Sequence, residues 1–320
     1  MREKDKHKFR WLVFRPAKRE GFVQDLATVR SEQLQGIVNA FVSNTGRAHA
    51  LALAFAEIAC TVRRDQWCMD RARLKIESDM QSPFCDTPVS EALQNEFHAQ
   101  RAIWEKDSPE SRSSLIGHFG VRYVQELVQS NPRMDVSMDA LMSSVIIESW
   151  IAFESMVADL WVTAVDSGPA ILRKRVLLKT IKAGNAGDPV VDFTSADDIE
   201  HDPARKLGSA LRQARKVSFQ KLSLIVRNYE IAFTSRVKTI FEQENGYIAT
   251  LAAYRNALIH NAGKADSTFR NQIKGFKEFE GLGLNQKLIL DGELVHTLRH
   301  VAAAVGAKLI HYVDDVLTPP

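Results

Sequence analysis

The sequence predicts an all-α fold, and three observations support this prediction. Apolar residues recur at helical spacing in long segments, notably 23–80, 138–165 and 292–317, so each segment would bury one face of a helix. Few glycines or prolines interrupt these segments. No part of the chain shows the series of alternating apolar and polar residues that is typical of strands.

The first third of the chain divides into a basic tail and a helical region. Residues 1–20 contain eight Lys or Arg against three Asp or Glu, a balance that fits either contact with nucleic-acid phosphates or an ordinary solvated end. Residues 21–131 form a predicted helical domain of unknown role. Within it we expect a break at 82–91, where two prolines occur, a helix that ends near Lys106, and a further helix that ends near 130.

The remainder, 138–317, is predicted to be a second helical domain after a boundary near Asn131. Its first helix, 138–165, carries a wide apolar stripe, and its last helix covers 292–317. A polar loop rich in Gly, Asp and Pro lies at 182–202, and loops of this length are often functional. The other helices that we expect are 171–181, 203–216, 219–233 and 245–261.

Composition and cysteine count narrow the class of protein. The chain has 320 residues, of which 45% are hydrophobic and 25% charged, enough for a packed core. No apolar run reaches the roughly 20 residues of a membrane helix, and the basic N-terminus lacks a signal-peptide core, so we expect a soluble, cytoplasmic protein. The cysteines form no CxxC pair, which argues against disulfides or a zinc site and favours buried thiols; they are Cys60, Cys68 and Cys85.

The most informative stretch is YRNALIHNAG, residues 254–263. Asn256 and His260 are four residues apart and share a helix face, whereas Arg255 points about 140° away from His260 in a regular helix. A helix that ends near His260 can relax this angle. A second copy of the helix, related by a twofold axis, would bring two arginines and two histidines to one cleft.

These side chains suit RNA cleavage by the 2′-hydroxyl. The reaction needs a base for the hydroxyl proton, an acid for the leaving 5′-oxygen, and donors for the phosphate oxygens. Histidine titrates near neutral pH and serves as base or acid, and the guanidinium of arginine offers a fixed fork of donors. The chemistry requires neither a metal nor another cofactor, and we expect none.

Residues 138–317 resemble a HEPN domain, a helical fold defined by an Arg-polar-x3-to-5-His motif that Arg255, Asn256 and His260 match. The flanks are similar too: an early helix contains FESMVADLW, SFQKLSLIVRNYEIAF precedes the motif, and a long helix ends the domain. The resemblance implies a metal-independent endoribonuclease that acts on RNA as a homodimer, in a toxin–antitoxin or antiviral defence setting. It leaves room for an antitoxin or regulatory protein as a further partner.

Carried onto this sequence, the resemblance makes Arg255 and His260 the catalytic pair and Asn256 the polar residue that orients the site. Family members often place an acidic residue of the early helix near the arginine. Glu154 is our candidate because it lies among apolar neighbours, where an unpaired carboxylate is unfavourable; a water-exposed position at the edge of the stripe is the alternative. Two weaker candidates are Asp159 and Glu148.

Other polar and aromatic residues have two interpretations each. Tyr254 either stacks on a base or packs in the helix bundle. His296 and His300 have the i, i+4 spacing of a metal pair, but no third ligand is near them in the sequence, which favours surface or interface histidines. One helix face in the first domain would be basic, and it would contact either solvent or RNA. Its arginines are Arg63, Arg64, Arg71 and Arg73.

Two other functions fit the same sequence. The chain would be a non-catalytic binding or scaffold module if the polar motif serves to cap a helix end. It would be an antitoxin-type regulator if the N-terminal region masks a partner protein. The sequence does not indicate which RNA is cut.

Overall fold

The computed structural model of the chain describes residues 25–79, 89–106, 131–182, 206–214, 216–242, 246–276 and 281–319. Within these ranges the fold is all-α, as predicted, and extended backbone pairs at a bridge between Lys264 and Lys287 without forming a strand. The elements in chain order are α3 (Glu32–Asp79), α4 (Val89–Lys106), α7 (Pro132–Ser167), α8 (Ala170–Lys182), α10 (Leu207–Gln213), α11 (Leu222–Phe233), the 3₁₀ turn η3 (Ser235–Val237), α12 (Lys238–Glu242), α13 (Tyr247–His260), α14 (Ser267–Gln272) and α15 (Gly292–Leu317).

The chain forms two compact units. Unit 1 comprises Met1–Arg15, Ala50–Leu141 and Asp291–Glu293, and unit 2 comprises Pro16–His49, Met142–Leu290 and Leu294–Pro320. The boundaries therefore fall within α3 and within α7, not only in loops. In the described part of the chain, the beginning of α3 belongs to the same unit as the YRNALIHNAG stretch, whereas the sequence groups it with residues 21–131.

Unit 1 contains the second part of α3 together with α4. The rings of Trp67 and Trp104 lie 5.3 Å apart between their centroids, which joins the two helices. The guanidinium of Arg71 lies 4.9 Å from the centroid of the Trp67 ring, a distance at which a cation is attracted to the aromatic face. Arg64 Nε pairs with Asp65 at 2.8 Å. At least two of the four arginines in the predicted basic face thus have partners within the unit.

The core of unit 2 is built around α7. Its apolar stripe is buried as the sequence predicts, and the residues concerned are Val145, Ile146, Trp150, Phe153, Val157, Leu160, Trp161 and Ala164. Helix α11 is joined to α7 by two buried hydrogen bonds. The indole N–H of Trp161 donates to the Asn228 carbonyl at 3.0 Å, and the hydroxyl of Tyr229 donates to the Val157 carbonyl at 2.8 Å. Burial of each large apolar side chain contributes about 1.5–3 kcal/mol, so α7 anchors this unit.

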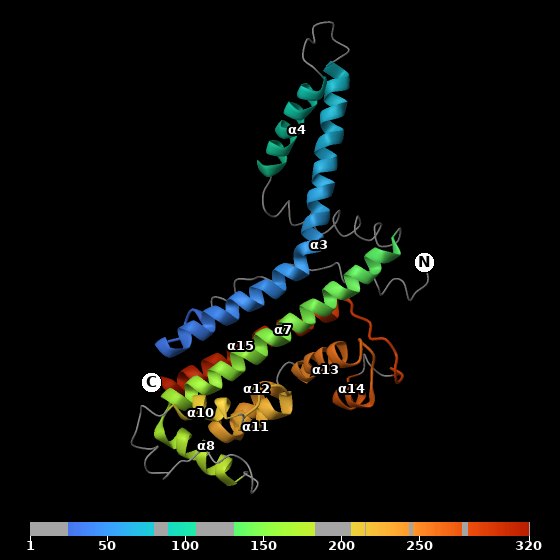
Figure 1. Cartoon of the computed structure of the whole chain (residues 1–320). Helices are drawn as coiled ribbons and strands as arrows, with labels where there is room; N and C mark the ends of the chain where they lie inside the picture. The colour runs from blue at the N-terminus through green and yellow to red at the C-terminus, as the bar shows by residue number, and fades with distance from the viewer. Residues whose placement is uncertain are drawn as a thin grey trace. The chain divides into compact units, whose positions relative to one another are not determined.

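Helix α15 approaches α3 and α7 closely at Gly306. A Cβ atom at this position would lie 2.4 Å from Cζ of Phe41 in α3 and 3.0 Å from Cε of Met156 in α7. Only a residue without a side chain fits there without movement of the aromatic ring. The three helices run alongside one another in unit 2 (Figure 1).

Helix α15 also holds the residues directly before α3. Asp314 is 3% exposed, and its carboxylate accepts hydrogen bonds from the backbone N–H groups of Arg30 at 3.1 Å and Ser31 at 2.7 Å. Arg30 Nε donates to the same carboxylate at 3.4 Å. Burial alone would raise the pKa of Asp314, but these donors outweigh it and hold that pKa below its ordinary value.

One segment of α7, Val136–Ser167, is long and apolar enough to cross a membrane by length and composition alone, and its 18-residue window has a mean hydropathy of 1.4. Core helices of globular proteins have the same composition, and the apolar stripe of α7 is buried inside unit 2. Polar residues such as Ser149 and Glu154 interrupt the segment. A search for uninterrupted apolar runs therefore does not identify this segment of α7 as a membrane helix.

Most predicted helices are present with shifted ends. Helix α4 ends at Lys106 and α15 covers 292–317, as predicted, whereas α7 begins earlier than expected and α10 is shorter than the predicted 203–216. The short elements η3, α12 and α14 were not predicted as separate helices. The basic tail and the helix expected to end near 130 lie outside the described residues, as do most of the 82–91 break and of the 182–202 loop.

Candidate active site at the end of helix α13

Helix α13 carries the YRNALIHNAG stretch and ends within it, at His260. One face of the helix is fixed in the core of unit 2. Tyr254 is 2% exposed, and its ring meets the ring of Phe269 in α14 edge-on, with centroids 5.1 Å apart. Tyr254 thus packs in the bundle, the second of its two interpretations, and positions α14 against α13.

The backbone completes the end of α13. The carbonyl of Ala257 accepts hydrogen bonds from the N–H groups of Asn261 and Gly263, each at 3.0 Å. This geometry requires a left-handed residue after the helix, which is Ala262 with a φ of 50°; Gly263, with a φ of 72°, continues the turn. Within the described chain, neither Arg255 nor His260 has a recorded hydrogen bond to a carbonyl of the helix end.

Residues that follow α13 tie it to α14 and to a later loop. Asp266 begins α14 by accepting from the backbone N–H of Phe269 at 2.7 Å, and its other oxygen accepts from the Asn261 amide at 2.6 Å. The Phe269 hydrogen bond is the largest influence on the carboxyl group and, with the Asn261 amide, holds the pKa of Asp266 below its ordinary value. Three backbone hydrogen bonds join residues 263–265 to residues 285–288.

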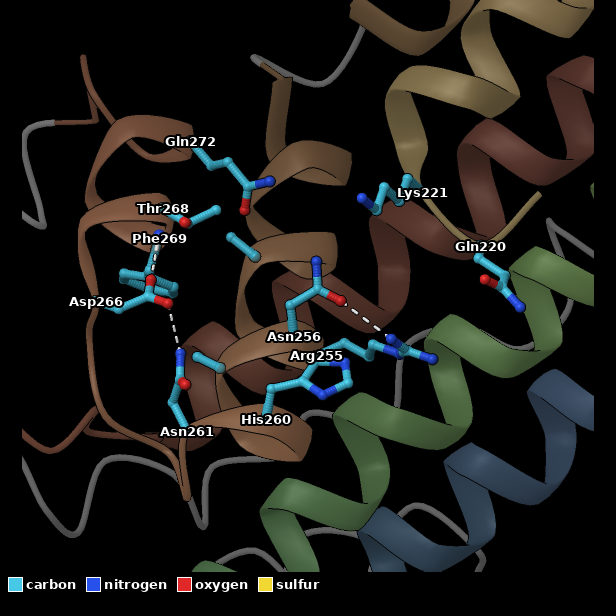
Figure 2. Close-up of a pocket in the computed structure, with 12 residues that line it drawn as sticks. Gln220, Lys221, Arg255, Asn256, His260, Asn261, Asp266, Thr268, Phe269 and Gln272 are labelled. Atoms are coloured by element: carbon cyan, nitrogen blue, oxygen red, sulfur yellow. Dashed lines mark hydrogen bonds between the residues drawn. The ribbon is translucent and has the colours of Figure 1, made fainter. Parts of the chain in front are cut away.

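A pocket with a volume of about 280 Å³ opens between α13, α14 and the turn before α11. Figure 2 shows the side chains that line it from these elements. The described residues that line it are Gln220, Lys221, Ala253, Arg255, Asn256, Ala257, His260, Asn261, Asp266, Thr268, Phe269 and Gln272. Among them Arg255 and Lys221 are permanent cations, and Asp266 is the carboxylate.

Arg255 and Asn256 orient one another. Arg255 Nη1 donates to Asn256 Oδ1 at 3.0 Å. Because this bond occupies the amide oxygen, the NH₂ group of Asn256 faces the other way, as Figure 2 shows, and offers two further donors. Nε of Arg255 is buried and has no hydrogen-bond partner among the described residues. A buried donor of this kind is unfavourable until an acceptor arrives.

His260 lies on the same pocket in spite of the angle between its position and that of Arg255. The helix stays regular through His260, so the long side chain of Arg255, and not a distortion of the helix, lets both residues reach the pocket. His260 is exposed. Figure 2 shows its imidazole beside the Arg255 side chain. Three of the four predicted site residues therefore line one pocket.

The acidic candidates have other partners. Glu154 is half-buried, does not line the pocket, and accepts from the indole N–H of Trp150 at 2.6 Å. Asp159 pairs with Arg212 at 2.5 Å, and Glu148 lies 3.6 Å from Arg47. The predicted position of Glu154 next to Arg255 stays a prediction.

Sequence reasoning did not find the opposite wall of the pocket. Gln220 and Lys221 come from the turn before α11, and Thr268 and Gln272 come from α14. None of them belongs to a spaced motif, so no local pattern indicates that they face Arg255. The turns before α11 and after α13 were the signal in the sequence that could have indicated these lining residues, because turns between helices bring neighbouring elements together.

Two further expectations concern histidine and cysteine. The rings of His296 and His300 stack 6.4 Å apart in α15, and burial, followed by the charges of Arg299 and His300, lowers the pKa of His296. Among the described residues, no group of three or more His, Cys, Asp or Glu side chains, including the pair His296 and His300, is placed so that it could hold a metal ion. Cys68 is buried and forms no disulfide within the described chain, in agreement with the prediction for that cysteine.

No family model, curated protein or solved structure matches the chain in comparisons with known proteins.

Proposed function

We propose that the chain is a metal-independent endoribonuclease that cleaves RNA by attack of the 2′-hydroxyl on the neighbouring phosphate. The observation that carries this proposal is the convergence of Arg255, Asn256 and His260 on one open pocket. The helix end is capped by Gly263 and Asn261 instead. The polar motif is thus not needed as a cap, which was the main structural explanation for it.

The proposed reaction assigns each side chain a step. The guanidinium of Arg255 and the NH₂ group of Asn256 donate to the non-bridging phosphate oxygens, where negative charge grows in the transition state. An imidazole accepts the 2′-hydroxyl proton while the 2′-oxygen bonds to phosphorus. The bond from phosphorus to the 5′-oxygen breaks, and that oxygen takes a proton from an acid. The products are a 2′,3′-cyclic phosphate and a free 5′-hydroxyl.

The proton transfers support a composite site at a homodimer interface. Attack and departure occur on opposite sides of the phosphorus atom, so one imidazole does not reach both oxygens at once. Among the described lining residues, His260 is the imidazole of the pocket. A second copy related by a twofold axis would supply the other. We place such an enzyme in a defence or toxin–antitoxin setting on the strength of the sequence resemblance to HEPN domains.

The test is RNA cleavage in EDTA by the parent protein and the His260→Ala variant, with analysis of the product ends. General acid–base catalysis contributes about 10²–10⁴ in rate, so we expect at least a hundredfold loss. His98→Ala is the matched control, because His98 is exposed on α4 in unit 1. Equal cleavage by parent and His260→Ala would refute the assignment.

A non-catalytic binding module is the second candidate, and one observation favours it. In the single chain the candidate acid Glu154 is bonded to Trp150 and does not line the pocket. A module of this class would bind RNA or nucleotide through Arg255 without turnover. Absence of any cleavage of total cellular RNA by the parent protein, together with measurable RNA binding, would favour it.

A further inference from the structure

The pocket has a second permanent cation, Lys221, that the Arg-polar-x3-His motif does not contain. Lys221 is the residue before α11, separated from Arg255 by the whole of α11, η3 and α12. It lines the same pocket as Arg255, from the turn before α11, and is labelled in Figure 2. The side chain is exposed and has no recorded ion pair in the described chain.

The charges that line the pocket are not balanced. Arg255 and Lys221 are the cations, and the carboxylate of Asp266 is the anion. Both oxygens of Asp266 already accept hydrogen bonds, one from the Phe269 backbone and the other from the Asn261 amide. Asp266 therefore serves the start of α14, while the two cations and the Asn256 NH₂ group keep donors for a ligand.

We infer that Lys221 and Arg255 together hold a phosphate of the RNA backbone, and that Lys221 is a positioning residue for the substrate. The proposal rests on the proposed function in that the ligand is RNA. A lysine is a point charge with rotating donors, suited to a phosphate of variable position, whereas the guanidinium of Arg255 is held in place by Asn256. Arg255 therefore fixes the orientation of the phosphate, and Lys221 adds a positive charge that adjusts to its position.

The size and lining of the pocket indicate single-stranded RNA. A volume of about 280 Å³ is near the lower end of small-molecule sites, about 300–1,000 Å³, so it suits one nucleotide unit. The amide group of Gln272 borders it, and amides hydrogen-bond the edges of bases that are not paired. The Phe269 ring is 2% exposed and is packed on Tyr254, which leaves polar contacts to hold the nucleotide.

The experiment measures binding, so that it does not depend on cleavage. A short single-stranded 2′-O-methyl RNA keeps every phosphate but lacks the attacking hydroxyl. We expect Lys221→Gln to weaken its binding to the full-length protein about tenfold, the size of one charge-assisted contact. The slope of log K against log salt should fall by about 0.7, the value for one phosphate contact on a single strand. Lys221→Arg should restore most of the affinity.

Lys274→Gln is the matched control. Lys274 is exposed directly after α14 but does not line the pocket, so its loss should leave affinity and slope close to those of the parent protein. Circular dichroism of each variant establishes that it is folded. An equal affinity and equal salt slope for Lys221→Gln and the parent would overturn the inference.

The outcomes separate the inference from the proposed function. If the parent binds the 2′-O-methyl RNA in a Lys221-dependent way but cleaves no RNA, the phosphate site stands and the nuclease assignment fails. If the parent cleaves RNA and Lys221→Gln changes neither KM nor binding, the nuclease stands and Lys221 is not part of its site. Loss of kcat at unchanged KM and affinity would also overturn the positioning role.

Discussion

Arg255 is the residue on which the candidate site depends most closely. One of its nitrogens is used, in the 3.0 Å bond to Asn256, while its buried Nε has no partner among the described residues. A guanidinium with its hydrogen bonds satisfied by a carboxylate would have little affinity left for a phosphate. Asn256 restrains the arginine with a neutral acceptor and so keeps the full positive charge for the ligand.

Substitution of Asn256 should reveal this difference between a neutral and a charged neighbour. We expect Asn256→Asp to weaken binding of the 2′-O-methyl RNA about tenfold, about 1.4 kcal/mol, because the new carboxylate would pair with Arg255 and repel phosphate. Asn256→Ala should have a smaller effect, since it removes a restraint without adding charge. Fluorescence anisotropy measures both. Similar affinities for the two variants would mean that Asn256 does not act through Arg255.

The sequence predicts one wall of the pocket and not the other. Arg255, Asn256 and His260 lie within six consecutive positions, so a local pattern finds them. Lys221 and Gln272 are ordinary polar residues at the ends of their helices, and only the packing of Tyr254 against Phe269 and the turns around α11 bring them near. The angle of about 140° between the positions of Arg255 and His260 in a regular helix also takes no account of the length of the arginine side chain.

At the scale of elements, Asp314 joins α15 to the residues that begin α3. Its carboxylate accepts two backbone N–H bonds at a helix start, where donors otherwise lack partners. The side chain of Asp314 is 4% exposed, whereas that of its neighbour Asp315 is 75% exposed and pairs with Arg30 at 2.7 Å. The two aspartates therefore differ mainly in burial and in backbone contacts.

We expect low pH to weaken the contact between Asp314 and the residues that begin α3. The folded pKa of Asp314 lies below the value of about 3.9 for an unfolded chain. The ionised group therefore stabilises the fold above that value, and the stabilisation is lost as pH falls through the folded pKa. Asp314→Asn should lower the free energy of unfolding at pH 7 by about 1–3 kcal/mol and reduce its decline below pH 4.

Urea unfolding at pH 7 and pH 3 measures the effect, with Asp315→Asn as the control. Because Asp315 is exposed, its substitution should change the free energy of unfolding by less than about 0.5 kcal/mol. A parent and an Asp314→Asn variant with the same stability at pH 7 would show that the hydrogen bonds to Arg30 and Ser31 contribute nothing.

Long helices were predictable and short ones were not. Helices α7 and α15 have enough turns for an apolar stripe to repeat, and both are present, α15 with the predicted bounds and α7 longer than predicted. By contrast, α12 has five residues and α14 has six, too few for any period to appear. Helix α14 begins at the local Asp266 cap and is held in the core by Phe269, whose contact with Tyr254 joins it to another helix.

At the scale of the whole molecule, the proposed chemistry favours a pair of chains. The pocket supplies an imidazole, two cations and several amides, whereas cleavage needs a base and an acid on opposite sides of the phosphate. We therefore expect the active species to be a pair of chains. The resemblance to HEPN domains leads to the same expectation.

Mixing experiments test this expectation. An excess of His260→Ala protein, allowed to exchange with the parent, should reduce the cleavage rate below the value expected from parent concentration alone, because mixed pairs have one imidazole. The same excess of an unrelated protein should leave the rate unchanged. A rate that follows parent concentration in both cases would assign the reaction to a single chain.

The hydrogen bonds between residues 263–265 and 285–288 limit how the protein can be engineered. Judged by sequence alone, the polar segment GLNQK, residues 283–287, is a suitable site to attach a fluorophore or a peptide tag. Its backbone, however, is paired with the residues directly after His260: Leu288 N–H donates to Gly263 and Asn285 N–H to Ala265, each at 2.8 Å. A graft there would disturb the backbone that follows the proposed catalytic histidine, so we expect a label at this segment to perturb the candidate site although it is remote in sequence.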